Sequence, residues 1–155
     1  MGVIFACPQV LFAATIHVPA EQATIQAGIN AAVNGDTVLV APGVYTENID
    51  FIGKSIVVTS DFVNSSDTND IINTIIDGQG LGSDVTFSGH CDTTTCLMGF
   101  TLINGKGTLA WTGNYFGSGI AIVEGATASP IVKYNYISNN VLHGQVIRRL
   151  LERLE

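Results

Sequence analysis

Four aspartates in the middle of the chain are the residues that could do hydrolytic chemistry. If the chain repeats a structural unit, Asp61, Asp77, Asp84 and Asp92 can align on neighbouring units and form the carboxylate pair that glycoside hydrolysis uses. Their glycine- and serine-rich surroundings indicate solvated loop carboxylates instead. We therefore expect no catalytic residue in this chain, and no cofactor or bound metal ion.

The segment from Gly105 to Gly119 has the residues best suited to hold a ligand. It carries Trp111, Tyr115 and Phe116 among glycines, and aromatic faces stack well on sugar rings. These three residues are the predicted glycan-binding residues. The alternative is that they pack the loop over a sheet.

Two cysteines lie close together in the sequence CDTTTC. Cys91 and Cys96 can form a disulfide if the loop between them brings them within bonding reach, and an exported protein permits this. The alternative is two free or buried thiols. A zinc site is not indicated, because His90 is the only other soft ligand nearby and the spacing is not a zinc signature.

Composition restricts the class of protein. The 155 residues are 46% apolar, which predicts one folded domain with a real core. Only 12% are charged and 17 are glycine, which favours β-structure with many tight turns. The net charge of −7 and the six basic residues argue against nucleic-acid binding.

The first 14 residues are apolar and carry no charged side chain. They are typical of the remnant of a signal peptide that ends in small residues, although the usual basic start is missing. The alternative is a first strand of the fold. The run is too short to span a bilayer, so we expect no stable membrane span and a location outside the cell, at its surface or in a periplasm.

The order of elements that must position these residues starts with a helix. Apolar residues at helical spacing predict a helix over Thr24 to Asn34, and a strand follows at Thr37 to Val40. The polar segment Phe62 to Asp70 is expected to be a loop. Further short β-prone runs lie at Ser55–Thr59, Thr74–Asp77, Asp84–Ser88, Leu97–Asn104, Gly119–Val123 and Ile131–Ser138.

These runs are too closely spaced for crossover helices, which excludes a doubly wound fold. An antiparallel sandwich and a solenoid of parallel strands both remain. Comparable apolar strands recur at intervals of roughly 20 to 45 residues, which favours the solenoid.

The sequence resembles the right-handed parallel β-helix proteins of the pectate lyase-like superfamily. The resemblance covers about Ile16 to Asn140 and rests on TIQAGINAAVNGDTVLVAPGVYTENI, GKSIVVTS, IIDGQG, LMGFTLING and SPIVKYNYISNN in that order. It implies an all-β, short solenoid of roughly four coils, about 4.8 Å apart, whose first coil is plugged by the helix. It also implies carbohydrate as the first substrate class, especially acidic plant or bacterial polysaccharides.

The enzymes of that superfamily need groups that this chain lacks. The lyases use a basic residue, typically Arg, and the first arginine here is Arg148; Lys54, Lys106 and Lys133 are scattered. A pectin methylesterase site uses two Asp with Gln and Arg on adjacent coils. Asp77 and Gln79 are the only similar pair, and Asp-Gly is a common turn dipeptide.

The last 15 residues, 141–155, have a different composition, with leucine, arginine and glutamate in a helical pattern. One face of this predicted amphipathic helix carries Val146, Ile147, Leu150, Leu151 and Leu154. Such a short helix is marginal alone, so it should plug the last coil or form an oligomer contact. A remnant of a truncated gene is the third alternative.

Two functions follow from these observations. One is a non-catalytic exported module that binds a polysaccharide, and the other is a structural or interaction unit, a homo-oligomer and most simply a dimer. The alternative is a small carbohydrate-active enzyme, that is, a lyase, esterase or hydrolase.

Overall fold

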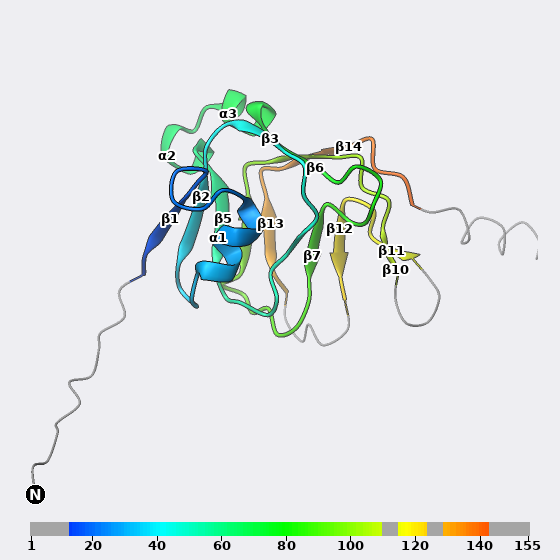
Figure 1. Ribbon diagram of the computed structural model, residues 1–155, viewed down its shortest axis with the longest axis horizontal. Helices are drawn as coiled ribbons and strands as arrows, with labels where there is room; N and C mark the ends of the chain where they lie inside the picture. Colours follow the sequence, from blue (N-terminus) through cyan, green and yellow to red (C-terminus); the bar gives the residue numbers. More distant parts are fainter. Residues whose placement is uncertain (1–12, 110–114, 124–128, 143–155) are drawn as a thin grey trace, which may run out of the picture.

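The computed structural model describes residues 13–109, 115–123 and 129–142 (Figure 1). This part of the chain is mostly β-structure with parallel sheets and few helices, which confirms the prediction at that level. Trp111, the first 12 residues and the predicted contact face at Val146, Ile147, Leu150, Leu151 and Leu154 lie outside the described residues.

Three parallel sheets contain most of the described strands. Sheet A has the order β1 (Thr15–Val18), β2 (Thr37–Val40), β5 (Val57–Ser60), β8 (Cys96–Met98) and β13 (Ile131–Lys133). Sheet B has the order β3 (Gly43–Tyr45), β6 (Thr74–Asp77), β9 (Thr101–Ile103) and β14 (Tyr136–Ser138). Sheet C has the order β4 (Ile49–Asp50), β7 (Val85–Phe87) and β12 (Ile120–Ile122). A separate antiparallel pair joins β10 (Thr108–Leu109) to β11 (Tyr115–Phe116).

The described chain visits the sheets in the order A, B, C. The first pass contributes β2, β3 and β4, the second β5, β6 and β7, and the third β8, β9 and β12. The fourth pass contributes β13 and β14. Successive passes pair in register, so that Val38, Val58, Leu97 and Val132 are neighbours across sheet A.

Two apolar runs that were predicted as single strands each form two strands, one in sheet A and one in sheet B. The runs Leu97–Asn104 and Ile131–Ser138 are broken at Gly99 and Tyr134, which follow β8 and β13 at equivalent positions. Their backbone φ angles are 85° and 54°, in the left-handed region that turns the chain. A left-handed residue therefore marks the corner between sheets A and B in these two passes.

The segment expected to be a loop after residue 61 contains two short helices, α2 (Phe62–Ser65) and α3 (Thr68–Asn73). Asp67 caps α3, because its carboxylate accepts a hydrogen bond from the Asn69 N–H at 2.9 Å. Neither helix buries a residue. The expectation of a loop failed because side-chain capping can stabilise a short helix in a polar segment. Such a helix has no apolar face, so hydrophobic spacing does not predict it.

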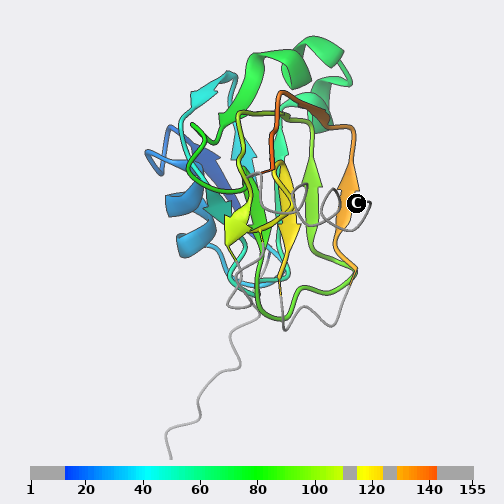
Figure 2. The same ribbon diagram turned by 90° about the vertical axis from the view of Figure 1, so that its right-hand side faces the viewer.

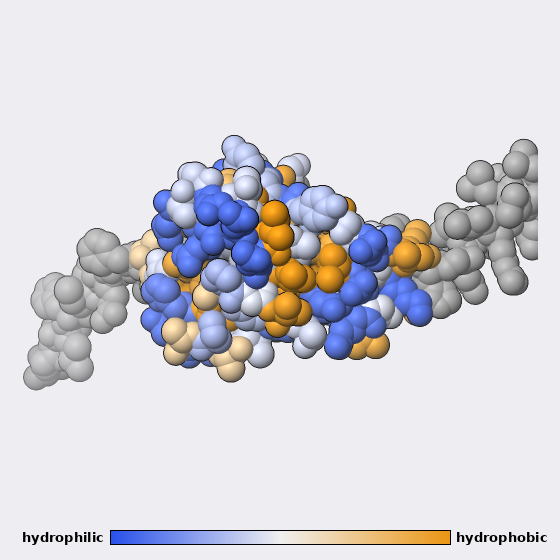
Figure 3. Space-filling model, turned by 90° about the horizontal axis from the view of Figure 1, so that it is seen from above, coloured by the Kyte–Doolittle hydropathy of each residue, from blue (hydrophilic) through white to orange (hydrophobic). Residues whose placement is uncertain are grey.

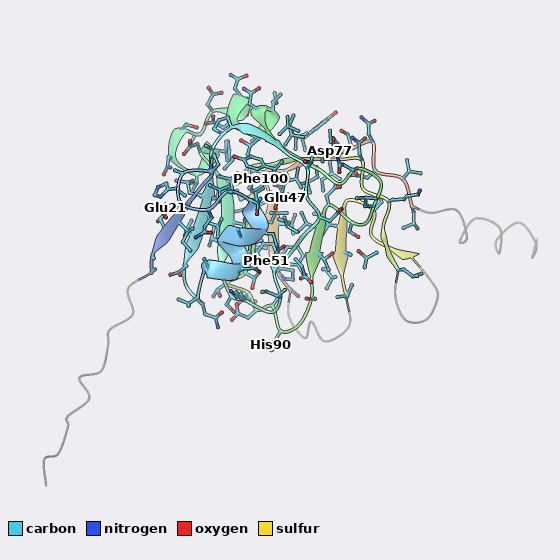
Figure 4. All side chains as sticks on the ribbon, viewed as in Figure 1. Glu21, Glu47, Phe51, Asp77, His90 and Phe100 are labelled. Carbon is cyan, nitrogen blue, oxygen red and sulfur yellow. The ribbon has the colours of Figure 1, made fainter. Side chains whose placement is uncertain are left out.

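The core lies between the three sheets. The rings of Phe51 and Phe87 stack with centroids 4.5 Å apart, and Phe100 is fully buried with them (Figure 4). On its outside, sheet B has exposed apolar residues such as Val44, and apolar side chains gather among polar ones on that side (Figure 3).

Helix α1 (Ile25–Ala31) covers the core beside the first pass, which confirms the predicted helix. Ile25 and Ile29 are fully buried. A Cβ on Gly28 would lie 2.8 Å from Val38 Cγ1, so the helix approaches sheet A as closely as glycine allows.

Two charged side chains from the first pass fix the ends of α1. The Glu47 carboxylate accepts hydrogen bonds from the N–H groups of Ile25 and Gln26 at 2.9 and 3.0 Å. Lys54 Nζ donates to three carbonyls at the other end, those of residues 29, 30 and 32, at 2.7 to 2.8 Å. Both charges also have the sign that the helix dipole favours. No described helix has the length and apolar composition needed to cross a bilayer.

Candidate functional site

An open pocket of about 620 Å³, lined by both polar and apolar residues, lies where the second, third and fourth passes leave sheet B. We call it the corner pocket. Gln79, Asn104 and Asn139 turn the three passes with φ angles of 52°, 63° and 56°. The lining residues are Asp77, Gln79, Gly80, Asn104, Gly105, Lys106, Asn139, Val141 and Leu142.

Asp77 organises one wall of the corner pocket. Its Oδ1 accepts a hydrogen bond from the Gln79 N–H at 2.9 Å and another from the Asn104 amide Nδ2 at 3.0 Å. The first bond closes the turn predicted at Asp-Gly, and the second ties the second pass to the third. In the part of the chain that the structure describes, no protein group is hydrogen-bonded to Oδ2, so it is available as an acceptor for a ligand.

Lys106 supplies the positive charge among the lining residues. Its backbone N–H donates to the Gly82 carbonyl at 2.7 Å, which holds the start of the 105–119 segment against the second pass. Thr108 and Ser83 hydrogen-bond through their hydroxyl groups at 2.8 Å. The β10–β11 pair, which includes the predicted glycan-binding residues Tyr115 and Phe116, therefore begins beside the corner pocket.

Asp84 lies behind Gly105, which lines the pocket, and against Gly78. It is completely buried, and neither carboxylate oxygen makes a hydrogen bond of ordinary geometry to the described residues. A Cβ added to Gly78 or Gly105 would lie 2.2 or 2.7 Å from its Oδ1, so the carboxyl occupies the space that the two glycines leave. The expectation that Asp84 is solvated was wrong. The glycines near it do not mark a solvated loop but leave space in which the Asp84 side chain is buried.

The environment of Asp84 favours its neutral form. Desolvation raises the pKa of this carboxyl to about 8, and the negative charge of Asp77 acts in the same direction. The Asn140 amide and the Gly78 N–H are close enough to oppose the shift in part. At neutral pH the protonated carboxyl therefore predominates.

The four aspartates do not meet in one place. Asp61 precedes α2, where its Oδ1 accepts from Asn64 Nδ2 at 3.5 Å. Asp92 accepts bonds from the backbone and hydroxyl of Thr94, which lower the pKa of Asp92 to about 2. Figure 4 shows Asp77 on the upper side of the molecule and His90, which neighbours Asp92 in sequence, at the bottom. Only Asp77 and Asp84 are close enough to influence each other.

The two cysteines of the described part are buried free thiols, the second of the two alternatives for them. Cys91 Sγ donates to the Ser88 carbonyl at 3.5 Å, and Cys96 lies in β8. Desolvation raises the pKa of both thiols, which makes them poor nucleophiles. The described residues also contain no group of three or more His, Cys, Asp or Glu placed to hold a metal ion.

Sequence reasoning missed the corner pocket as a site. The sequence features that mark it are the polar residues at the ends of the motifs IIDGQG, TLING and YISNN. In the structure these residues form the turns at the ends of strands of sheet B. These residues meet in one pocket only because of the register in which successive passes pair. The spacing of the motifs in the sequence does not predict that register. No family model, curated protein or solved structure matches this chain.

Proposed function

We propose that this chain is a short right-handed parallel β-helix that binds an uncharged glycan in the corner pocket and does not cleave it. The repeated order of sheets A, B and C and the in-register parallel pairing support that fold. Parallel crossover connections are right-handed in about 98% of cases, which supports the hand.

The observation that carries the binding function is the chemistry of the pocket lining. A volume of about 620 Å³ lies within the usual range for small-ligand sites. Asp77 Oδ2 can accept from a sugar hydroxyl, while the side chains of Asn104 and Asn139 can both donate and accept. Val141 and Leu142 offer an apolar surface for the C–H face of a sugar ring.

Charge favours a neutral glycan over an acidic one. The chain carries a net charge of −7, and the pocket itself has one carboxylate beside its one ammonium group. A polyuronate would be repelled at a distance and would meet Asp77 on arrival. A neutral ligand whose hydroxyls bind both Asp77 and Lys106 avoids the long-range repulsion by the net charge and the local repulsion by Asp77.

The positions of the carboxyl groups weaken the alternative of a hydrolase. Glycoside hydrolysis uses two accessible carboxyls on either side of the bond that breaks. Asp77 lines the pocket, whereas Asp84 is completely buried behind Gly78 and Gly105 and cannot touch a sugar held there.

Titration calorimetry with neutral and uronic-acid oligosaccharides tests the proposal. We expect binding of a neutral oligosaccharide, weakened at least tenfold by Asp77→Asn, because the amide keeps one acceptor but loses the charge and Oδ2. Asp61→Asn makes the same charge change away from the pocket and should bind as the unaltered chain does. If none of the oligosaccharides binds, or if both variants bind equally well, the corner pocket is not the glycan site. Release of reducing sugar would favour the enzyme alternative.

An interaction unit is the second candidate, and the last pass favours it. Apolar or aromatic side chains there are largely exposed: Ile131, Val132, Tyr134, Tyr136, Ile137 and Val141. Exposed apolar surface of this kind marks contact sites in many proteins. Light scattering over a range of concentrations would show self-association as a rising mass.

A further inference from the structure

Three columns of apolar side chains run through the core, one in each sheet, and each ends in an exposed residue. Leu97, Leu102 and Phe87 are fully buried in sheets A, B and C. Their register partners one pass further along are Val132, Ile137 and Ile122, which are 39%, 49% and 55% exposed. The last strands of the three sheets therefore leave an open end of the core, which we call the open end.

The open end combines apolar surface with unpaired strands. The strands β13, β14 and β12 are the terminal members of their sheets. Figure 2 faces the side of the molecule on which β13 and β14, in orange, are seen. An edge of this kind invites a covering element, because it leaves both aliphatic side chains and backbone hydrogen-bonding groups in water.

The opposite end of the described stack shows what such a cover looks like. There α1 places Ile25 and Ile29 against the apolar residues of the first pass, Ala32 follows directly after the helix, and all three are buried. The cover is a short amphipathic helix directly connected to the strands that it protects.

We propose that residues 143–155 of the same chain cover the open end as an amphipathic helix. The segment starts directly after Leu142, where the fourth pass has left sheet B, and the order of the passes leads next to the sheet C side and Ile122. A helix over residues 145–154 would be about 15 Å long, more than the roughly 10 Å that separates packed sheets. Its apolar face is formed by Val146, Ile147, Leu150, Leu151 and Leu154.

Tethering and charge both favour this occupant over a second copy of the chain. A segment joined to Leu142 by a few residues has an effective concentration on the order of millimolar at the open end. Two copies would each bring a net charge of −7 to the contact. In the proposed helix Arg148 and Glu152 would lie on the face opposite the apolar one and would remain in water.

Amide hydrogen exchange and light scattering on the full chain test this proposal. Leu150→Asp places a charge in the apolar face, and Gln145→Asp makes the same charge change on the opposite face of the helix. The full chain and the Gln145→Asp variant should be monomers with slow exchange at the paired amides of β13 and β14. The Leu150→Asp variant should exchange there at least tenfold faster, while the amides of α1 stay unchanged and show that the fold is intact.

Two results would overturn it. A full chain that is a dimer, and that Leu150→Asp converts to a monomer, would assign the open end to a second copy. A monomer whose β13 and β14 exchange equally in all three proteins would show that residues 143–155 do not touch the open end. Neither result depends on glycan binding, so the two proposals can fail separately.

Discussion

The two ends of the stacked strands receive very different protection from the described chain. At the first end α1 buries the core, and Glu47 and Lys54 hold both termini of that helix through side-chain hydrogen bonds. At the last end Val132 and Ile137 continue buried columns and are yet half exposed. The difference shows that hydrogen bonding to one neighbouring strand does not by itself bury a side chain. An inward-facing side chain is buried only when a further strand or a helix covers it on its other side.

Two buried aspartates sharpen the contrast. Asp36, near the first end, accepts hydrogen bonds from the N–H groups of Val33 and Ala14, and these bonds lower its pKa. Asp84, near the corner pocket, has no hydrogen bond of ordinary geometry to the described residues, and desolvation raises its pKa to about 8. One carboxylate stabilises the fold when charged, and the other destabilises it when charged.

The largest effect is expected at Asp84. Its native pKa of about 8 exceeds the unfolded value near 4, so the native state binds the extra proton between these pH values. Stability should therefore fall as pH rises from about 4 to 8. Asp84→Asn should remove that fall and raise the free energy of unfolding at pH 8 by up to about 5 kcal/mol, because one pKa unit is worth about 1.4 kcal/mol.

Asp36→Asn is the matched variant, with the opposite sign. Since the pKa of Asp36 is lowered, its contribution is present above the unfolded pKa and is lost as pH falls through the native pKa. Urea unfolding of both variants from about pH 2 to 8 measures the effects, because the Asp36 contribution is lost below about pH 4 and the Asp84 effect develops above it. Destabilisation at pH 8 by both variants would contradict the contrast.

The next largest effect compares two isoleucines in one column of sheet B. Ile76 is fully buried and Ile137 is 49% exposed. Ile76→Ala should cost about 3 kcal/mol through lost burial and a cavity, whereas Ile137→Ala should cost about 1 kcal/mol or less. If residues 143–155 cover the open end, the cost at Ile137 should fall to near zero in the Leu150→Asp background. Equal costs at the two positions in the Leu150→Asp background, measured by urea unfolding, would refute the difference between the ends.

A smaller effect is expected from the lysine that holds α1. Lys54→Met removes three charge-assisted hydrogen bonds to carbonyls and should lower the free energy of unfolding by about 2 kcal/mol. Lys133→Met, on exposed β13, should change it by less than about 0.5 kcal/mol. Hydrogen exchange should locate the loss at α1. A loss spread evenly over all sheets would mean that Lys54 does not act through the helix.

The smallest effect concerns the corners. Ile52 is a β-branched residue with φ 47°, on the first pass, and Ile52→Asn should raise the free energy of unfolding by about 1 kcal/mol. Asn139, with φ 56° on the last pass, already has a side chain that tolerates this conformation, so Asn139→Gly should be nearly neutral. Thermal unfolding of the two variants checks this order, and a loss on Ile52→Asn would show that the Ile52 side chain contributes more than its strain.

Several features of the fold could be predicted from local pattern. The helix near residue 25 and the strand Thr74–Asp77 follow from apolar spacing. The parallel arrangement was favoured by the recurrence of apolar strands at intervals of roughly 20 to 45 residues. The short strands β3 and β4 were missed because Gly43–Tyr45 and Ile49–Asp50 are too brief to show a period. The breaks at Gly99 and Tyr134, which divide two apolar runs into two strands each, were missed. Both residues have a left-handed backbone, which the apolar pattern of the runs does not predict.

The site could be predicted less well than the fold. The turn at Asp77 was expected, but its place beside Asn104 and Asn139 depends on register between passes that lie far apart in the chain. The burial of Asp84 was also hidden, because it depends on the empty Cβ positions of Gly78 and Gly105 rather than on its own neighbours in sequence. Local signals predict elements, whereas contacts between passes create the pocket.

The most direct test of glycan binding in the corner pocket is an NMR titration of the full chain with a neutral oligosaccharide. We expect amide shifts at residues 77–80, 104–106 and 139–142, which surround the pocket, and none in α1 at the opposite end. Shifts confined to other surfaces, or no shifts with any saccharide, would contradict the assignment of the corner pocket as a glycan site.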